Sequence, residues 1–115
     1  MTEPHDRPTA RELVEAVREF LERDVMAATE GRVQFHTRVA VNVLGTVQRE
    51  LELGPEQAAA HHARLDALGF ADEAELAAAI RSGSVDDRYD EIKSAVAATV
   101  KDKLTVANPK YLDAP

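Results

Sequence analysis

Apolar positions recur along this chain at three- and four-residue intervals, which is the rhythm of amphipathic helices. The first such segment runs from Leu13 to Met26, with glutamates and arginines on its other side. Thr9 followed three residues later by Glu12 matches the capping box that begins a helix. Gly31 suits a left-handed cap after the helix has ended. The pattern therefore predicts a first helix between Thr9 and Gly31.

The next segment, from Gly31 to Leu53, is the one around which we expect the fold to be organised. At about 100° per residue it divides into two faces of different character. Arg38, Asn42, Gly45 and Arg49 fall within roughly 60° of one another on one side. The opposite side is a broad apolar stripe, predicted to face a core, with His36 inside it. This stripe consists of Val33, Val39, Ala40, Val43, Leu44, Val47 and Leu51.

Proline and glycine mark the remaining boundaries. Gly54-Pro55 predicts the end of the second helix and the start of a third, which Gly69 would stop near Leu68. Asp72 predicts the start of a short helix, and a last helix is expected from about Asp86 to Asn108, before Pro109. No segment alternates with the period of two that is typical of strands. We predict an all-α fold, a compact antiparallel bundle of four main helices plus one short helix. Residues 1–115 would form a single domain, with residues 1–8 as a polar arm.

Composition narrows the function classes. The chain has 115 residues, a net charge of −7 and no cysteine. The missing cysteines exclude a disulfide scaffold, a thiolate metal site and a cysteine nucleophile. The acidic balance argues against nucleic-acid binding and against a polybasic membrane patch. With a polar start and no apolar run near the ~20 residues that span a bilayer, a cytoplasmic domain is expected.

The histidines are the obvious candidates for chemistry, and each has a structural alternative. His36 at the stripe is more readily explained as a half-buried, hydrogen-bonded side chain than as a general base. His61 and His62 are adjacent, so they point about 100° apart and are poorly placed to share a metal ion. His62 and Asp66 have i,i+4 spacing, but a third ligand is missing. We therefore predict no metal, no cofactor and, on balance, no enzymatic activity.

The arginine-bearing side of the second helix is the stronger candidate. A glycine inside a helix costs about 1 kcal/mol relative to alanine, so Gly45 is expected to have a packing reason. We favour contact with another helix, within the chain or in a second subunit. Binding of a small phosphate or carboxylate by Arg38 and Arg49 is the alternative.

Four stretches resemble a bacterial family of small all-helical domains of unknown function. They are His5–Ala10 with Glu12-Leu13, Gly31-Arg32 followed by Phe35-His36, Arg38–Ala40 and Asn42, then Arg49–Pro55, and finally Asp102–Leu104 with Asn108–Tyr111. Members of that family are commonly encoded beside aminoglycoside-phosphotransferase-like kinases and acyl-CoA dehydrogenases. The resemblance implies an accessory role and no activity of its own.

From the matching stretches we predict a contact set for a ligand or partner. Asp6 and Arg7 in the arm are weaker additions to it. The first hypothesis is a non-catalytic module that binds a phosphotransferase-like kinase or an acyl-CoA dehydrogenase, or pairs with itself. The second is a domain that binds an anionic metabolite. An enzyme with His36 as base and Glu50 as its partner is disfavoured, because these residues would be roughly 21 Å apart along one helix. The contact set consists of His36, Arg38, Asn42, Arg49, Lys103, Asn108 and Tyr111.

Overall fold

The structure, a computed structural model, describes residues 4–113 and consists of helices and their connections, with no strand over that range. The predicted all-α class is therefore confirmed. The chain divides into two compact units, residues 1–53 (unit 1) and 54–115 (unit 2). We describe each by itself. Across the described residues, none of the helices has the length and apolar character that crossing a membrane requires.

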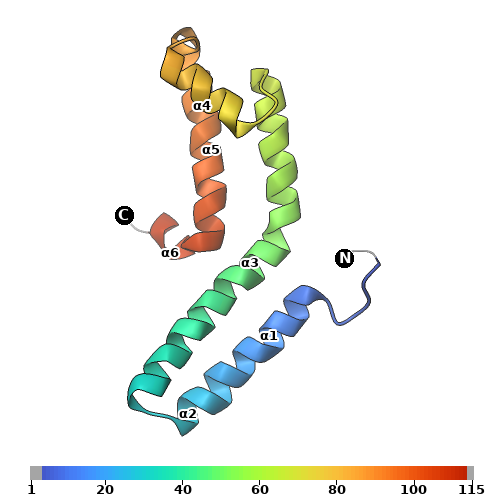
Figure 1. The fold of residues 1–115 in the computed structure, drawn as a ribbon, viewed down its shortest axis with the longest axis vertical. Helices are drawn as coiled ribbons and strands as arrows, with labels where there is room; N and C mark the ends of the chain where they lie inside the picture. Colours follow the sequence, from blue (N-terminus) through green and yellow to red (C-terminus); the bar gives the residue numbers. More distant parts are fainter. Residues whose placement is uncertain (1–3, 114–115) are drawn as a thin grey trace. The chain divides into compact units, whose positions relative to one another are not determined.

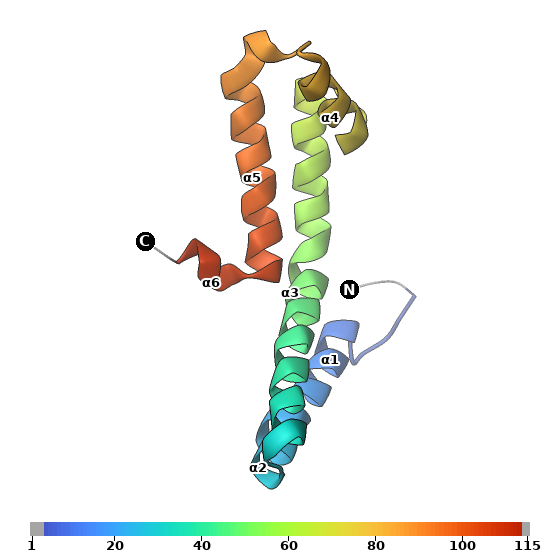
Figure 2. The ribbon, with the colours of Figure 1, turned by 60° about the vertical axis from the view of Figure 1, so that its left-hand side comes forward.

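Unit 1 is built on two antiparallel helical segments (Figures 1 and 2). The first comprises α1 (Ala10–Phe20), a single π-helical stretch η1 (Leu21–Val25) and the short α2 (Met26–Ala28). The predicted capping box is present. The Glu12 backbone N–H donates to Thr9 Oγ1 at 3.2 Å, and the Thr9 N–H donates to Glu12 Oε1 at 2.9 Å.

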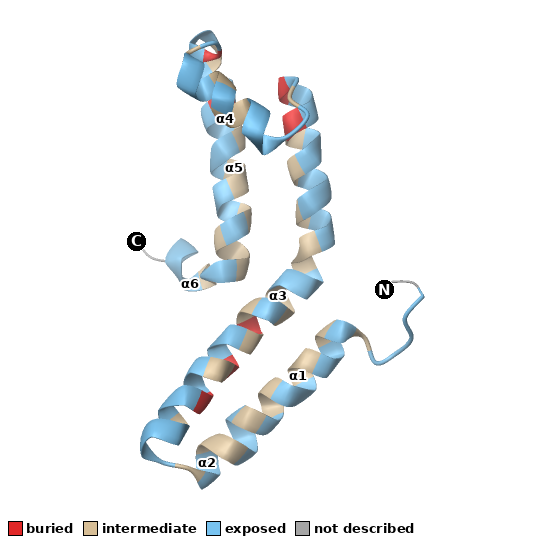
Figure 3. Ribbon diagram, in the orientation of Figure 1, coloured by how far each residue is buried: buried red, intermediate tan, exposed pale blue. Residues whose placement is uncertain are grey.

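The second segment is the first part of α3 (Gly31–Leu68), which returns alongside α1. The row of α3 that is buried in unit 1 consists of Thr37, Val41 and Gly45 (Figure 3). The predicted core stripe is wrong for this unit, because Val39, Val43 and Val47 on it are 37–54% exposed. A polar residue can lie in the buried row since the Thr37 hydroxyl donates to the Val33 carbonyl at 2.7 Å and is thereby satisfied.

The predicted helix break at Gly54-Pro55 is also wrong. α3 continues through both residues, so two of the four main helices expected from the sequence are one helix of 38 residues. Proline clashes with the Cβ of the residue before it when that residue is helical, but Gly54 has no Cβ. The helix therefore tolerates Pro55 at the cost of one backbone hydrogen bond.

Unit 2 contains the C-terminal part of α3, α4 (Glu73–Ser82), the 3₁₀ turn η2 (Asp86–Arg88), α5 (Tyr89–Ala107) and α6 (Pro109–Leu112). The predicted start at Asp72 is confirmed, because its side chain accepts a hydrogen bond from the Glu75 N–H at 2.9 Å. Gly69 and Gly83 take positive φ angles of 90° and 81° after their helices. The core joins all three main helices of the unit. It consists of Leu68, Val85 and Ile92, with Phe70, Leu76, Ala79 and Ala95 packed against them.

Candidate functional site

The predicted contact set is divided between the two units. His36, Arg38, Asn42 and Arg49 belong to unit 1. Lys103 near the end of α5, with Asn108 and Tyr111 at α6, belongs to unit 2, and all three are exposed. Asp6 and Arg7 are exposed in the arm before α1. Each unit thus presents its own candidate surface.

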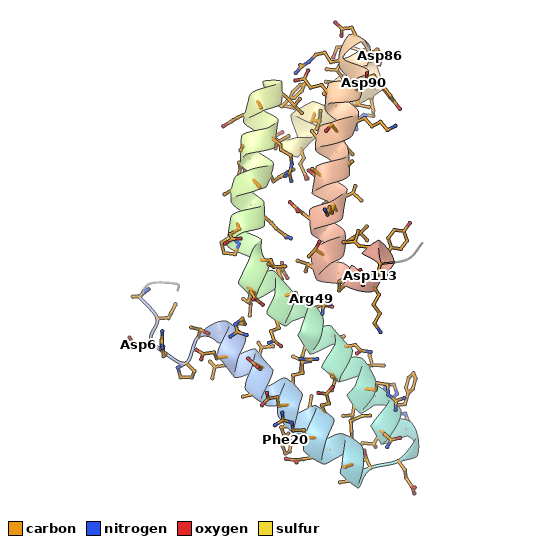
Figure 4. All side chains as sticks on the ribbon, turned by 180° about the vertical axis from the view of Figure 1, so that it is seen from behind. Asp6, Phe20, Arg49, Asp86, Asp90 and Asp113 are labelled. Carbon is orange, nitrogen blue, oxygen red and sulfur yellow. The ribbon has the colours of Figure 1, made fainter. Side chains whose placement is uncertain are left out.

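The arginine-bearing side of unit 1 lies beside the contact between α1 and α3. Arg38 and Asn42 are exposed, whereas Arg49 is half-buried and donates to Thr46 Oγ1 at 3.2 Å. Figure 4 marks Arg49 on α3. A Cβ placed on Gly45 would lie 3.5 Å from Arg49 Nη1 and 3.7 Å from Arg18 Nε of α1. Both are ordinary van der Waals distances, so Gly45 lies beside two arginine side chains, but the packing reason expected for a glycine at this position is not found.

The other side of unit 1 is apolar and open. Each helix carries a row of three apolar residues that is turned away from the side on which the two helices meet. Around the α1 axis, Leu13, Val17 and Phe20 lie about 110° from that side. Around the α3 axis, Val43, Val47 and Leu51 lie about 120° from it. Because the helices are antiparallel, both rotations bring these rows to the same side of the pair. We call these six residues the apolar face. Their side chains are 37–56% exposed, and Phe20 is marked in Figure 4.

His36 is placed on the side of the apolar face. It lines an open, shallow hollow between the two segments, together with Leu21, Val33 and Ala40. Its ring meets the ring of Phe35 edge-on, with 5.3 Å between the centroids. No acidic partner that would make it a general base is placed against it among the described residues. The structure therefore separates His36 from Arg38, Asn42 and Arg49, which lie on the opposite side.

Unit 2 holds a pocket of about 230 Å³ that the sequence did not predict as a site. It lies between the C-terminal part of α3, α4 and α5. One signal for it is present in the sequence, because His61, Arg64, Leu65 and Leu68 share one helical face and Val96, Thr99, Val100 and Lys103 repeat the same spacing on α5. Lys103 is the member of the predicted contact set that lines it. The walls are mostly apolar and consist of Leu65, Leu68, Leu76, Ala77, Ile80, Ala95, Val96 and Val100.

A chain of polar contacts crosses one edge of this pocket. His61 Nε2 lies 2.9 Å from Glu73 Oε1 on α4, and His61 Nδ1 lies 3.3 Å from Thr99 Oγ1 on α5. Arg64 Nη2 donates to the same Thr99 oxygen at 3.3 Å and to Asp102 Oδ2 at 3.1 Å. The contacts join three helices through side chains that are individually half-buried or exposed.

The order carboxylate, imidazole, hydroxyl in Glu73, His61 and Thr99 is the order used for nucleophilic catalysis. Acyl transfer also needs donors aimed at a developing oxyanion. Thr99 lies in the middle of α5, where backbone N–H groups are used within the helix, so its own backbone supplies no such donor. The contacts link α4 and α5 to α3. We call them the interhelical clasp, which consists of His61, Arg64, Glu73, Thr99 and Asp102.

Metal binding has no comparable support in the structure. Over residues 4–113, no three histidine or acidic side chains converge on a common point where they could hold an ion. His62 and Asp66 are both exposed.

Comparison with known proteins places the chain in a family without an assigned activity. Neither the curated proteins nor the solved structures contain a match. Residues 27–111 match the family described as Domain of unknown function (DUF6285). The match extends from α2 to α6, and so includes all of α3 and the pocket of unit 2, whereas α1 precedes it. Because it covers well over half of the sequence, this chain belongs to the DUF6285 family.

Proposed function

We propose that this protein is a non-catalytic interaction module of the cytoplasm that binds a protein partner through the apolar face of unit 1. The observation that carries the proposal is the exposure of Leu13, Val17 and Phe20 beside Val43, Val47 and Leu51 on one side of a helix pair. Single exposed apolar residues are ordinary, whereas a contiguous apolar patch of a few hundred Å² is often functional.

The size of the face indicates the kind of partnership. With six side chains about half exposed, the apolar area is on the order of 300 Å². This matches the largest apolar patch of a typical monomer. Since interfaces are about 57% apolar, such a face would anchor roughly 500 Å² on each partner. That is the size of a transient contact rather than of an obligate dimer.

The family resemblance proposes the partner. A phosphotransferase-like kinase or an acyl-CoA dehydrogenase is the expected binding protein, and a second copy of the chain is the other occupant that we consider. A partner that laid helices on the apolar face would complete an antiparallel bundle of the kind predicted from the sequence. Such a bundle stays a prediction.

Two double variants of the full chain separate the two sides of unit 1. Val17→Glu with Val43→Glu puts charges on the apolar face, and Arg38→Ala with Arg49→Ala alters the opposite side. Val17 and Val43 are 52% and 54% exposed, so the first variant is expected to fold with an unchanged circular-dichroism spectrum. Each tagged chain is expressed in the organism that naturally produces the protein, and the proteins that co-purify with it are identified by mass spectrometry. Sedimentation equilibrium then measures self-association.

We expect a kinase or dehydrogenase, or a second copy, to be recovered with the native chain and with the arginine variant, and to be lost from the valine variant. Loss from the arginine variant alone would move the interface to the Arg38 side. Recovery of the same partner with both variants, or a native chain that is monomeric and without partners, would refute the proposal.

Binding of an anionic metabolite is the second candidate function. The arginine side of unit 1 offers Arg38, an exposed guanidinium. The pocket of unit 2 offers a concave apolar wall as well as cationic side chains, and is therefore the better place to look for a ligand.

A further inference from the structure

We propose that the pocket of unit 2 is a binding site for a small monocarboxylate of about six carbons. This site is separate from the contact set predicted from the sequence, of which it includes only Lys103. The inference does not depend on the interaction proposed for unit 1, because the pocket lies wholly in the other unit and its test has a different readout.

The apolar body has a complementary wall. Three helices contribute to this wall, and its residues are Leu65 and Leu68 of α3, Leu76 and Ile80 of α4, and Val96 and Val100 of α5. Ile80, Val96 and Val100 remain 39–47% exposed, although the neighbouring Leu65 and Leu68 are buried. A ligand in the pocket would cover apolar surface that the fold itself leaves open.

The charge expected of the ligand follows from the hydrogen-bond donors around the pocket that have no acceptor. Thr99, His61 and Asp102 are occupied by one another and by Arg64 and Glu73. Two cationic donors remain. Arg64 Nε is buried without an acceptor, and Lys103 has no hydrogen-bond or ion-pair partner among residues 4–113. The complementary group is an anionic acceptor, for which a carboxylate has the right shape and charge.

The other charges around the pocket fix where this carboxylate lies. Glu73 places a negative charge beside His61, 2.9 Å from its Nε2 atom. Asp102 is paired with Arg64 at 3.1 Å. Lys103 is one helical turn beyond Thr99 on α5, on the side away from that Glu73 contact. The head group is therefore expected at Lys103, with the apolar body running toward Ile80.

The volume limits the size of the ligand. At about 30 Å³ for each water-sized group, the pocket of about 230 Å³ accommodates roughly eight non-hydrogen atoms. Hexanoate has that number and is the probe that we choose. A ligand of this size supports a dissociation constant on the order of 1 mM, which suits titration by nuclear magnetic resonance.

The experiment is a titration of the ¹⁵N-labelled full chain, with amide shifts followed residue by residue. Hexanoate is compared with hexan-1-ol, which keeps the body without the charge, with acetate, which keeps the charge without the body, and with hexylammonium, which inverts the charge. We expect saturable shifts from hexanoate at Ile80, Val96 and Lys103. Binding of hexan-1-ol should be at least five-fold weaker, and acetate and hexylammonium should give no saturable shifts there.

Lys103→Met tests the head-group position, because methionine keeps an unbranched apolar side chain and removes the ammonium. It should weaken hexanoate at least five-fold and leave hexan-1-ol unchanged. Lys101→Met is the matched control, since Lys101 is exposed on the same helix but does not line the pocket. The proposal is overturned if hexanoate and hexan-1-ol bind equally, if the shifts map outside the pocket, if Lys101→Met has the same effect as Lys103→Met, or if no saturation is reached at 20 mM.

Discussion

Replacing Gly45 by alanine is the sharpest test of how α1 and α3 meet. Gly45 is buried in the middle of a helix, the position at which glycine is most costly. The added methyl group would lie 3.5 Å from Arg49 Nη1 and 3.7 Å from Arg18 Nε. Both distances are ordinary van der Waals contacts, and both atoms are at or near the ends of flexible side chains. The methyl group therefore fits without moving the helices.

The expected result is a more stable protein. Alanine in a helix interior is favoured over glycine by about 0.5–1 kcal/mol, chiefly because the unfolded chain loses less freedom. No clash offsets this gain at Gly45. The free energy of unfolding should rise by about 0.5–1 kcal/mol, which corresponds to a few degrees in melting temperature for a chain of this size. Urea unfolding followed by circular dichroism at 222 nm measures the change.

Gly69→Ala is the matched control. A Cβ at Gly69 would likewise meet no clash, because nothing lies within 4 Å of it, but its φ of 90° is strained for alanine. This variant should lose about 1 kcal/mol. If Gly45→Ala were destabilising by the same amount, α1 and α3 would have to approach more closely than the structure shows, and the reasoning on Arg18 and Arg49 would fail.

Three further predictions concern the continuity of α3, the start of α1 and the interhelical clasp. Pro55→Ala should raise the free energy of unfolding by about 1–3 kcal/mol, since it restores a helical N–H inside α3, and no gain in a urea titration would mean that the helix does end there. Two hydrogen bonds hold the pKa of Glu12 below its ordinary value, the stronger from the Thr9 N–H and the weaker from the Thr9 hydroxyl. The carboxylate therefore stabilises the fold at neutral pH, and this stabilisation is lost as the pH falls through the lowered pKa. Native and Glu12→Gln chains should therefore converge in melting temperature as the pH falls below the ordinary range of a glutamate pKa, and a constant difference throughout an acid titration would count against the capping box. Thr99→Val removes the hydroxyl that contacts both His61 and Arg64, and should cost about 1–3 kcal/mol in thermal unfolding, whereas Ser94→Ala at an exposed position of α5 should change it by less than about 0.5 kcal/mol.

Local features of this fold were predictable from the sequence. The Thr9 capping box, the Asp72 cap and the end of α5 before Pro109 are all confirmed. Each depends on hydrogen bonds and steric contacts within four or five residues, so the information is contained in a short stretch of chain. The all-α class follows from the same short-range periodicity.

The burial of α3 was not predictable in this way. Its apolar residues cover more than half of its circumference, and periodicity alone does not say which sector a neighbouring helix covers. The structure places Thr37, Val41 and Gly45 against α1, and leaves Val43 and Val47 open. The break predicted at Pro55 failed because Gly54 has no Cβ, so the clash that keeps the residue before a proline out of a helix is reduced.

The candidate sites show the same difference between features that depend on a short stretch of chain and features that depend on tertiary packing. The sequence by itself determined the helical class, the Thr9 and Asp72 caps and the two-sided character of α3, with Arg38 and Asn42 opposite the apolar residues. Only the tertiary structure decided that this apolar side is exposed and that His61, Arg64, Thr99 and Lys103 surround a pocket. These four residues come from helices more than thirty positions apart, and a sequence pattern carries no distance across such a separation. Packing of α3, α4 and α5 around Leu68, Val85 and Ile92 brings them together.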